Sequence, residues 1–234
     1  MSRTNLDSPW IILVSSVFVT SLLTSNIIAV KIVDFGTLPL LGAIVVDAAI
    51  IVFPISYIIG DVLTEVYGFH IARRIIWIGF LCNLIMVVFI YVGGLLTPSS
   101  IWAGQESYTE ILGFSRRLIV ASFLAYLVGE FANSYILAKL KIRMRGRLLF
   151  VRTISSTVVG QGLDSLIFVF VAFGGLLTLN DMIRMVLINW GFKVFYEAVA
   201  TPVTYGVIDF LKNKEGIDTY DSGLTLNPFF KRRR

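Results

Sequence analysis

Asp61 and Glu65 lie in an apolar stretch, FPISYIIGDVLTEVYG (53–68), where their spacing of four residues places them on one face of a helix. A charged side chain at mid-bilayer costs about 2.5–3.5 kcal/mol, so such a residue must face the protein interior or a hydrated cavity. A carboxylate there could accept hydrogen bonds from the N–H groups of a ligand, or hold a proton. We expect Asp61 to point into a central cavity. Glu65 is nearer the end of the stretch and is expected at the inner mouth, among headgroups or paired with an arginine.

Other polar residues recur at helical spacing within apolar runs. Glu130 and Asn133 are three residues apart, and Lys193 and Glu197 are four residues apart, so each pair shares a helical face. Polar faces on several helices of an apolar bundle can meet only at its centre, which predicts a binding cavity. The residues expected to line this cavity are Asn26, Asp61, Glu130, Asn133, Gln161, Asp164, Trp190, Phe192, Lys193, Tyr196 and Glu197.

Several of these residues also have a purely structural explanation. Lys193 and Glu197 are placed to form an ion pair along one helix. Asn26 and Gln161 could each form an ordinary hydrogen bond between helices. Glu130 and Asp164 are acidic and lie in the middle of their runs, so a structural role is least expected for them.

The elements that must position these residues are membrane-spanning helices. The chain has 234 residues, of which 56% are hydrophobic and 15% charged, and its mean hydropathy is +0.83, too apolar for an ordinary soluble domain. A helix needs about 20 apolar residues to cross a bilayer. Runs near or above this length lie at about 10–30, 43–67, 71–96, 118–138, 153–176 and 184–211. They predict an all-α integral membrane protein, with six transmembrane helices around a central polar cavity in one domain (1–212).

The connections between the runs add further detail. Within 43–67, a single continuous helix would place Asp47, Pro54, Asp61 and Glu65 on one stripe. The long connection at 97–117 has room for a short amphipathic helix at the membrane interface. From 213 to 234 the chain becomes polar and ends in KRRR, which predicts a basic cytoplasmic tail at anionic headgroups.

Lysine and arginine predict the orientation in the membrane. With the N-terminus inside, the basic block at 139–152 and the basic C-terminus both lie on the inner side. The outer side then receives only Lys31, Arg116, Arg117 and Arg184. By the positive-inside rule both termini are cytoplasmic, and we expect a multi-pass protein of the cell (inner) membrane.

Enzymatic explanations find little support in the sequence. His70 is the only histidine, so neither a Ser–His relay nor an HExxH zinc site can be built. Asp61 and Asp164 could form an aspartic-protease dyad, but the glycine-flanked motifs around such a dyad are missing. There is no Walker motif for ATP hydrolysis. We expect no cofactor and no metal. The basic residues follow membrane topology, so we also expect no nucleic-acid partner.

A family resemblance rests on four phrases: FPISYIIGDVLTEVYGFHIARRIIW (53–77), ASFLAYLVGE (121–130), TISSTVVGQGLDSLIFVFVAF (153–173) and FKVFYEAVATPVTYGV (192–207). In this order, after an early Ser-Asn at 25–26, they resemble the queuosine-precursor transporter family, also called vitamin-uptake-like transporters. The resemblance implies a six-helix protein that imports 7-cyano-7-deazaguanine or 7-aminomethyl-7-deazaguanine, with queuine as the substrate of some relatives. It also implies a fold similar to the substrate-binding subunits of energy-coupling-factor transporters, without their ATPase module.

The chemistry of such a substrate suits the polar residues. A 7-deazaguanine presents N1–H and its 2-amino group as adjacent donors, beside the O6 acceptor of a flat ring. A carboxylate can accept two such donors side by side, so we expect Glu130, Asp164 or Glu197 to bind this edge. The groups expected to complete the pocket are Asn26, Gln161, Lys193 and the aromatic rings of Phe168, Trp190, Phe192 and Tyr196, which can stack on the base.

Three alternatives stay open at this stage. The substrate could be another nucleobase-like or vitamin solute, or the chain could be an intramembrane enzyme. Transport could be driven by a proton or sodium gradient, or it could be facilitated entry followed by metabolic trapping. We favour facilitated entry, because a scarce neutral base that is consumed inside the cell needs no pump. The expected partners are the lipid bilayer and the small-molecule substrate, and a homodimer is compatible with the sequence.

Overall fold

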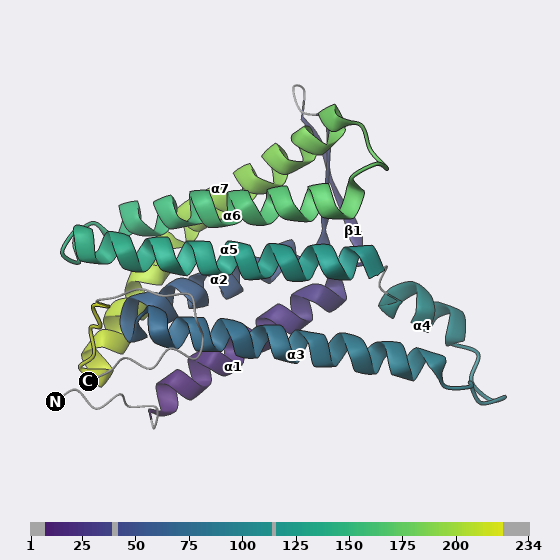
Figure 1. The fold of residues 1–234 in the computed structure, drawn as a ribbon, viewed down its shortest axis with the longest axis horizontal. Coiled ribbons are helices and arrows are strands. Elements are labelled where there is room, and N and C mark those ends of the chain that lie inside the picture. Colours follow the sequence, from purple (N-terminus) through teal and green to yellow (C-terminus); the bar gives the residue numbers. More distant parts are fainter. Residues whose placement is uncertain (1–7, 39–41, 114–115, 222–234) are drawn as a thin grey trace.

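The computed structural model describes residues 8–38, 42–113 and 116–221 (Figure 1). Its elements in chain order are α1 (Pro9–Ile28), β1 (Ile32–Leu38), β2 (Gly42–Asp47), the 3-10 helix η1 (Ala48–Ile51), α2 (Phe53–Val62), the π-helix η2 (Leu63–Tyr67), α3 (Phe69–Leu95), α4 (Gln105–Leu112), α5 (Arg116–Arg143), α6 (Leu149–Phe173) and α7 (Leu179–Glu215). The short helix α4 lies where the long connection leaves room for one.

The long helices match a membrane environment. Within the described ranges, four helical stretches are long and apolar enough to cross a bilayer: α1, α3, α6 and the stretch Gln105–Arg143 that ends in α5. Large apolar side chains such as Phe89, Leu95 and Leu166 remain exposed on these helices. Exposed apolar side chains on this scale are expected where lipid, and not water, surrounds the protein. The fold is therefore that of an all-α, multi-pass membrane protein, with one short β-hairpin.

The helices run back and forth between two ends of the molecule (Figure 1). At one end α1 begins, η2 leads into α3, α5 turns into α6, and α7 finishes. We call this the basic end, because it carries Arg73, Arg74, Lys139, Lys141, Arg143, Arg145, Arg147, Arg152, Lys212 and Lys214. The hairpin and α4 lie at the opposite end (Figure 1).

The second predicted span, 43–67, is not one helix. Gly42–Asp47 pairs with Ile32–Leu38 as an antiparallel hairpin. The Asp47 carboxylate accepts a hydrogen bond from the Ala49 N–H at 3.0 Å and begins η1, so Asp47 does not continue the stripe of Asp61. Pro54 stands in the first turn of α2, where a missing N–H costs nothing, and it does not kink the helix. With 10 residues in α2 and 5 in η2, this segment is shorter than the other spans.

Close packing of α5 on α6 is made possible by two glycines. A Cβ atom on Gly129 would lie 2.7 Å from the Cβ of Asp164, and one on Gly160 would lie 2.6 Å from the Cβ of Asn133. Real Cβ atoms do not approach this closely, so only glycine fits at both positions. The crossing places the polar residues of α5 directly beside those of α6.

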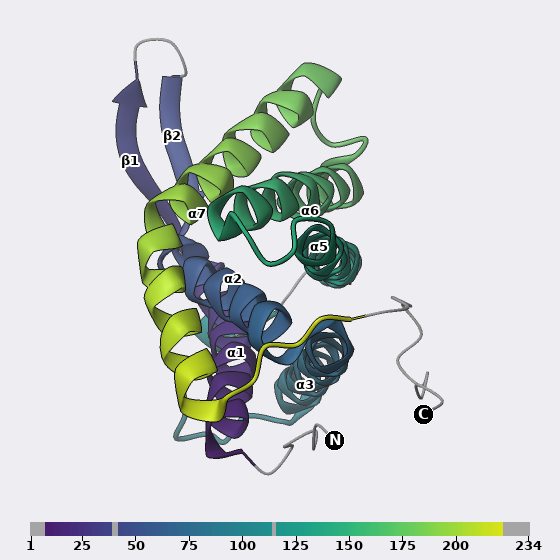
Figure 2. The same cartoon turned by 90° about the vertical axis from the view of Figure 1, so that its left-hand side faces the viewer.

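Helix α7 and the segment after it differ from the predicted polar tail. The helix has 37 residues, contains Pro202, and continues to Glu215. It ends at Gly216 in the left-handed conformation, and residues 216–221, which we call the strap, cross from α7 toward α3 (Figure 2). The remainder of the predicted tail, 222–234, lies outside the described residues.

Candidate functional site

Polar residues of α2, α5 and α7 come close together around Asp61, and the buried Gln161 lies on α6 beside its contact with α5. Asn133 on α5 donates from Nδ2 to Asp61 Oδ1 on α2, at 2.8 Å. Glu130 on α5 and Glu197 on α7 are near enough to act electrostatically on Asp61. Gln161 follows Gly160 at the α5–α6 crossing, where Gly160 packs on Asn133. We call Asp61, Glu130, Asn133, Gln161 and Glu197 the central cluster.

The central cluster has more acceptors than donors. All five side chains are buried, with 1–4% of their surface exposed. Each has an oxygen that accepts no hydrogen bond from any described residue; these atoms are Asp61 Oδ2, Glu130 Oε2, Asn133 Oδ1, Gln161 Oε1 and Glu197 Oε1. A buried polar atom without a partner costs about 1–3 kcal/mol, and more when charged. The chemical complement of this cluster is therefore a ligand rich in N–H donors.

Lys193 does not pair with Glu197, the partner that its spacing on the helix suggested. Its ammonium group forms an ion pair with Asp164 on α6, and lies 5.7 Å from the ring centre of Phe53 and 5.9 Å from that of Tyr57. Asp164 therefore has a partner within the protein, which the sequence analysis did not expect, and its contact with a ligand remains a prediction. Because Lys193 pairs with Asp164, it does not donate to Glu197, and Glu197 Oε1 accepts no hydrogen bond from any described residue.

Other predicted site residues have partners within the protein. Asn26 donates to the Leu22 carbonyl at 3.0 Å and accepts from Ser122 at 3.3 Å, which links α1 to α5. Trp190 donates to the Val158 carbonyl at 2.8 Å, so its indole is held against α6. Phe192 and Tyr196 keep exposed rings on α7. None of these four residues belongs to the central cluster, and their part in binding remains a prediction.

Three serines were missed by the sequence analysis. Ser56, Ser134 and Ser165 are buried, and no described residue makes a hydrogen bond to their hydroxyl groups. They stand on α2, α5 and α6, which also carry members of the central cluster. Serine is common in membrane helices as a packing residue, so its presence in an apolar run gives no distinct signal.

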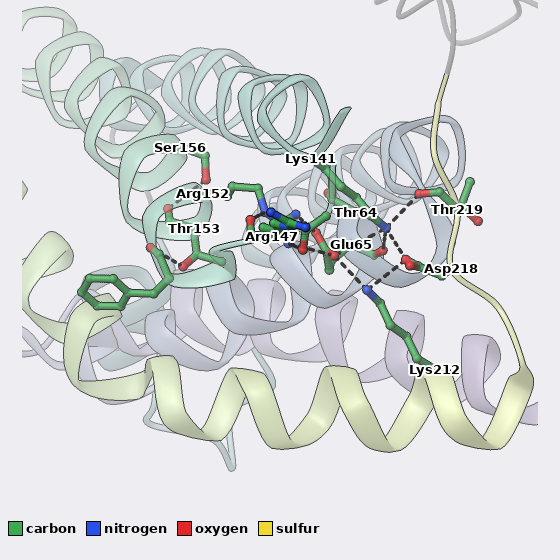
Figure 3. A network of polar contacts seen from close by, with 12 residues as sticks. Thr64, Glu65, Lys141, Arg147, Arg152, Thr153, Ser156, Lys212, Asp218 and Thr219 are labelled. Atoms are coloured by element: carbon green, nitrogen blue, oxygen red, sulfur yellow. Dashed lines mark hydrogen bonds and ion pairs between the residues drawn. The ribbon is translucent and has the colours of Figure 1, made fainter. Parts of the chain in front are cut away.

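A second polar group lies at the basic end, around Glu65 (Figure 3). The Glu65 carboxylate is 1% exposed and forms ion pairs with Arg152 on α6, with Lys212 at 2.9 Å and with Lys141 at 3.4 Å. Asp218 of the strap bridges Lys141 and Lys212 at 2.6 and 2.9 Å. We call these five residues the ionic cluster. The expected pairing of Glu65 with an arginine is confirmed.

The charge of Asp218 is stabilised by its two lysine neighbours. Partial burial by itself would raise the pKa of Asp218, but hydrogen bonds from Lys141 and Lys212 outweigh it and hold the pKa below its usual value. Asp218 is therefore an anion at neutral pH. It balances part of the positive charge that three basic side chains bring to Glu65.

The arrangement fits a protein that holds a solute within the membrane. Over the described ranges, no group of three His, Cys, Asp or Glu side chains is placed to hold a metal ion. What the helices do bring together is a buried set of acceptors at the centre and a ring of paired charges at one end.

Comparison with known proteins identifies the family. The family described as "Putative vitamin uptake transporter" matches residues 47–207, a range that contains the whole central cluster. The chain is 31% identical over 157 residues to the "Probable queuosine precursor transporter" of Bacillus subtilis (66% of this chain, 68% of that protein). It is 26% identical over 159 residues to the "Queuosine precursor transporter" of Escherichia coli (67% of this chain, 69% of that protein). No solved structure matches.

The chain belongs to this transporter family, which confirms the resemblance found in the sequence. It is accordingly a transporter and not an enzyme. The likeness to energy-coupling-factor subunits, like the homodimer, remains a prediction.

Proposed function

We propose that this protein imports queuosine precursors, 7-cyano-7-deazaguanine and 7-aminomethyl-7-deazaguanine, and that the central cluster is their binding site. The observation that carries the proposal is the set of five buried acceptor oxygens that no described residue satisfies. The relatives from B. subtilis and E. coli are named as transporters of queuosine precursors, which supports this class of substrate.

The proposed contacts follow from which oxygens are free. A deazaguanine offers N1–H, the 2-amino group and the pyrrole N–H as donors, and each needs an acceptor once water is removed. Glu130 and Glu197 are the best candidates to accept the adjacent N1–H and 2-amino donors, because Asp61 already accepts from Asn133. Lys193 is the candidate donor to O6, by turning part of its ammonium group from Asp164 toward the base.

The proposed topology has six crossings, with both termini in the cytoplasm and the basic end facing inward. It is supported by the alternation of the helices between the two ends of the molecule (Figure 1) and by the basic residues gathered at one of them. In this topology α2 and η2 form a short second crossing, which the hairpin completes toward the outer side. A cell membrane is the proposed location.

The decisive experiment is uptake by cells that cannot synthesise the precursors. Cells that express the protein should accumulate labelled 7-aminomethyl-7-deazaguanine, whereas cells that express Glu130→Gln to the same level should not. Glu106→Gln is the matched control, because Glu106 is exposed on α4, far from the central cluster. If well-expressed wild-type protein takes up neither precursor, the proposal is wrong.

A second candidate function rests on the name of the matching family, which refers to vitamin uptake. The same cells supply the test. An excess of unlabelled queuine, guanine or a water-soluble vitamin is added as competitor, and a vitamin that abolishes uptake at lower concentration than either deazaguanine would favour this alternative.

A further inference from the structure

We propose that the ionic cluster and the strap together form the inner gate of the transport path, which is closed in this structure, and that Glu65 is the residue that holds it shut. The inference goes beyond substrate binding, since none of these residues contacts the proposed site. It requires that the chain be a transporter, but not that the substrate be a deazaguanine.

The first observation is that the two polar groups share their helices. Four segments each contribute at least one residue to the central cluster and one to the ionic cluster. The pairs are Asp61 and Glu65 on α2 and η2, Glu130 and Lys141 on α5, Gln161 and Arg152 on α6, and Glu197 and Lys212 on α7. The segments that would surround the substrate are therefore the same segments that Glu65 ties together.

The second observation is the position of Glu65. It lies about one helical turn from Asp61 toward the basic end. A solute released from the central cluster toward that end must pass between the helix ends that Glu65 joins. While one buried carboxylate holds cations from three helices, these ends cannot separate.

The third observation is that this closure consists of charges. Glu65, Lys141 and Arg152 are each no more than 2% exposed, and their contacts are ion pairs and hydrogen bonds. Ion pairs can exchange a protein partner for water once an opening starts, because water solvates both partners. An apolar contact gains nothing from incoming water. Such a network therefore suits a contact that must form and break in every cycle.

The strap covers the ionic cluster from the cytoplasmic side. Lys141 donates to the Thr219 carbonyl at 2.9 Å and lies 4.6 Å from the ring centre of Tyr220. The Thr219 N–H donates to the Val66 carbonyl at 3.3 Å, so the strap also binds η2. The strap packs closely on Gly68, where only glycine leaves enough room, because a Cβ on Gly68 would lie 2.7 Å from the Thr219 methyl group.

The backbone under the strap is suited to movement. Glu65 lies in η2, a single π-helical turn, and Gly68 follows it with a φ of 88° that favours glycine. π-Turns occur frequently at functional sites, because the extra residue can be passed along a helix. A shift of register in η2 would move Glu65 relative to α5, α6 and α7 without unfolding α2 or α3.

The test measures access to a buried position behind the gate. Ser156 is fully buried on α6, one turn beyond Arg152, and its hydroxyl bonds only to the Thr153 carbonyl of its own helix. A reporter carries Ser156→Cys together with Cys82→Ser. Inside-out vesicles expose the cytoplasmic face to a charged, membrane-impermeant thiol reagent. Glu65→Gln should speed labelling at least tenfold, and Asp218→Asn by a smaller factor, whereas Glu106→Gln should leave the rate unchanged.

Two measurements keep the result interpretable. Substrate binding to purified Glu65→Gln protein should stay within a few-fold of the wild type, because no residue of the central cluster is replaced and Glu65 acts on Asp61 less strongly than Glu130 and Glu197 do. Asp218 is 43% exposed, so Asp218→Asn is expected to fold even if Glu65→Gln does not. The gate proposal is wrong if folded Asp218→Asn protein is labelled no faster than the reporter alone, and Glu65→Gln either gives the same rate or does not fold. The ionic cluster would then only hold the helix ends together permanently. Labelling needs no substrate, so this outcome is independent of the proposed function.

Discussion

Replacing Gly160 with alanine should separate α5 from α6 and weaken the central cluster. The new Cβ would stand 2.6 Å from the Asn133 Cβ and 2.9 Å from the Gly129 carbonyl oxygen. Both neighbours are fixed by helical backbone, so neither can turn aside, and the helices must move apart by several tenths of an ångström. Overpacking of this kind costs about 1–3 kcal/mol. Because Asn133 donates to Asp61 at 2.8 Å, its displacement should also weaken that hydrogen bond.

The control for this substitution is Gly191→Ala on α7. No atom lies within 4 Å of the position that a Cβ on Gly191 would occupy, and alanine is favoured over glycine in a helix by about 1 kcal/mol. In detergent, the melting temperature of Gly160→Ala should therefore be lower than that of the wild type, and the melting temperature of Gly191→Ala should be equal to it or higher. Deazaguanine affinity should fall only for Gly160→Ala. Equal melting temperatures and equal affinities for the two variants would refute the close crossing of α5 and α6.

Four further predictions concern the two polar clusters. Glu130→Gln replaces a carboxyl oxygen by an N–H donor in a site proposed to accept from the ligand, so deazaguanine affinity measured on purified protein should fall about 5- to 150-fold, because a buried polar group left without a partner costs about 1–3 kcal/mol. Asn133→Ala leaves the buried Asp61 Oδ1 unpaired and should lower the free energy of unfolding by about 1–3 kcal/mol, read from thermal melts against Gly191→Ala. The 7-aminomethyl base should compete better than the 7-cyano base, because an ammonium group adds donors to a site rich in free acceptors, whereas a nitrile only accepts. The pKa of Asp218 lies below its usual value, so docking of the strap should be unchanged from neutral pH down to about pH 5 and weaken as the pH falls through that lowered pKa. Amide hydrogen exchange at Thr219 should show this loss, and Asp218→Asn should remove the pH dependence.

Hydropathy predicted most of the helices because an unbroken apolar run leaves few alternatives. Five of the predicted spans correspond to α1, α3, α5, α6 and α7, with ends that differ by a few residues. The run at 43–67 is equally apolar, but it divides into a strand, a 3-10 turn, a short α-helix and a π-turn. Periodicity cannot separate these possibilities, since an apolar run fits a buried strand as well as a helix.

Side-chain partners were predictable only where the sequence limited the choice. Glu65 had many basic residues near its end of the bundle, and its pairing with an arginine was foreseen. Lys193 had Glu197 one turn away on its own helix, yet its partner is Asp164 on α6. That choice depends on how α6 packs against α7, which spacing along one helix does not contain. The buried serines illustrate the same limit, because only the folded bundle reveals that their hydroxyl groups are buried and receive no hydrogen bond from any described residue.

In the proposed topology α7 crosses the membrane, and its length would then make the protein sensitive to membrane thickness. At 1.5 Å per residue its 37 residues extend about 56 Å, nearly twice the hydrocarbon core of about 30 Å. Figure 1 shows the helix crossing the bundle obliquely, and Pro202 interrupts its hydrogen bonding partway. A helix that exceeds the bilayer adapts by tilting or bending, and both respond to lipid chain length. Glu197 and Lys212 stand on opposite sides of Pro202, so we expect a bend of α7 at Pro202 to shift the α7 residue of the central cluster relative to that of the ionic cluster.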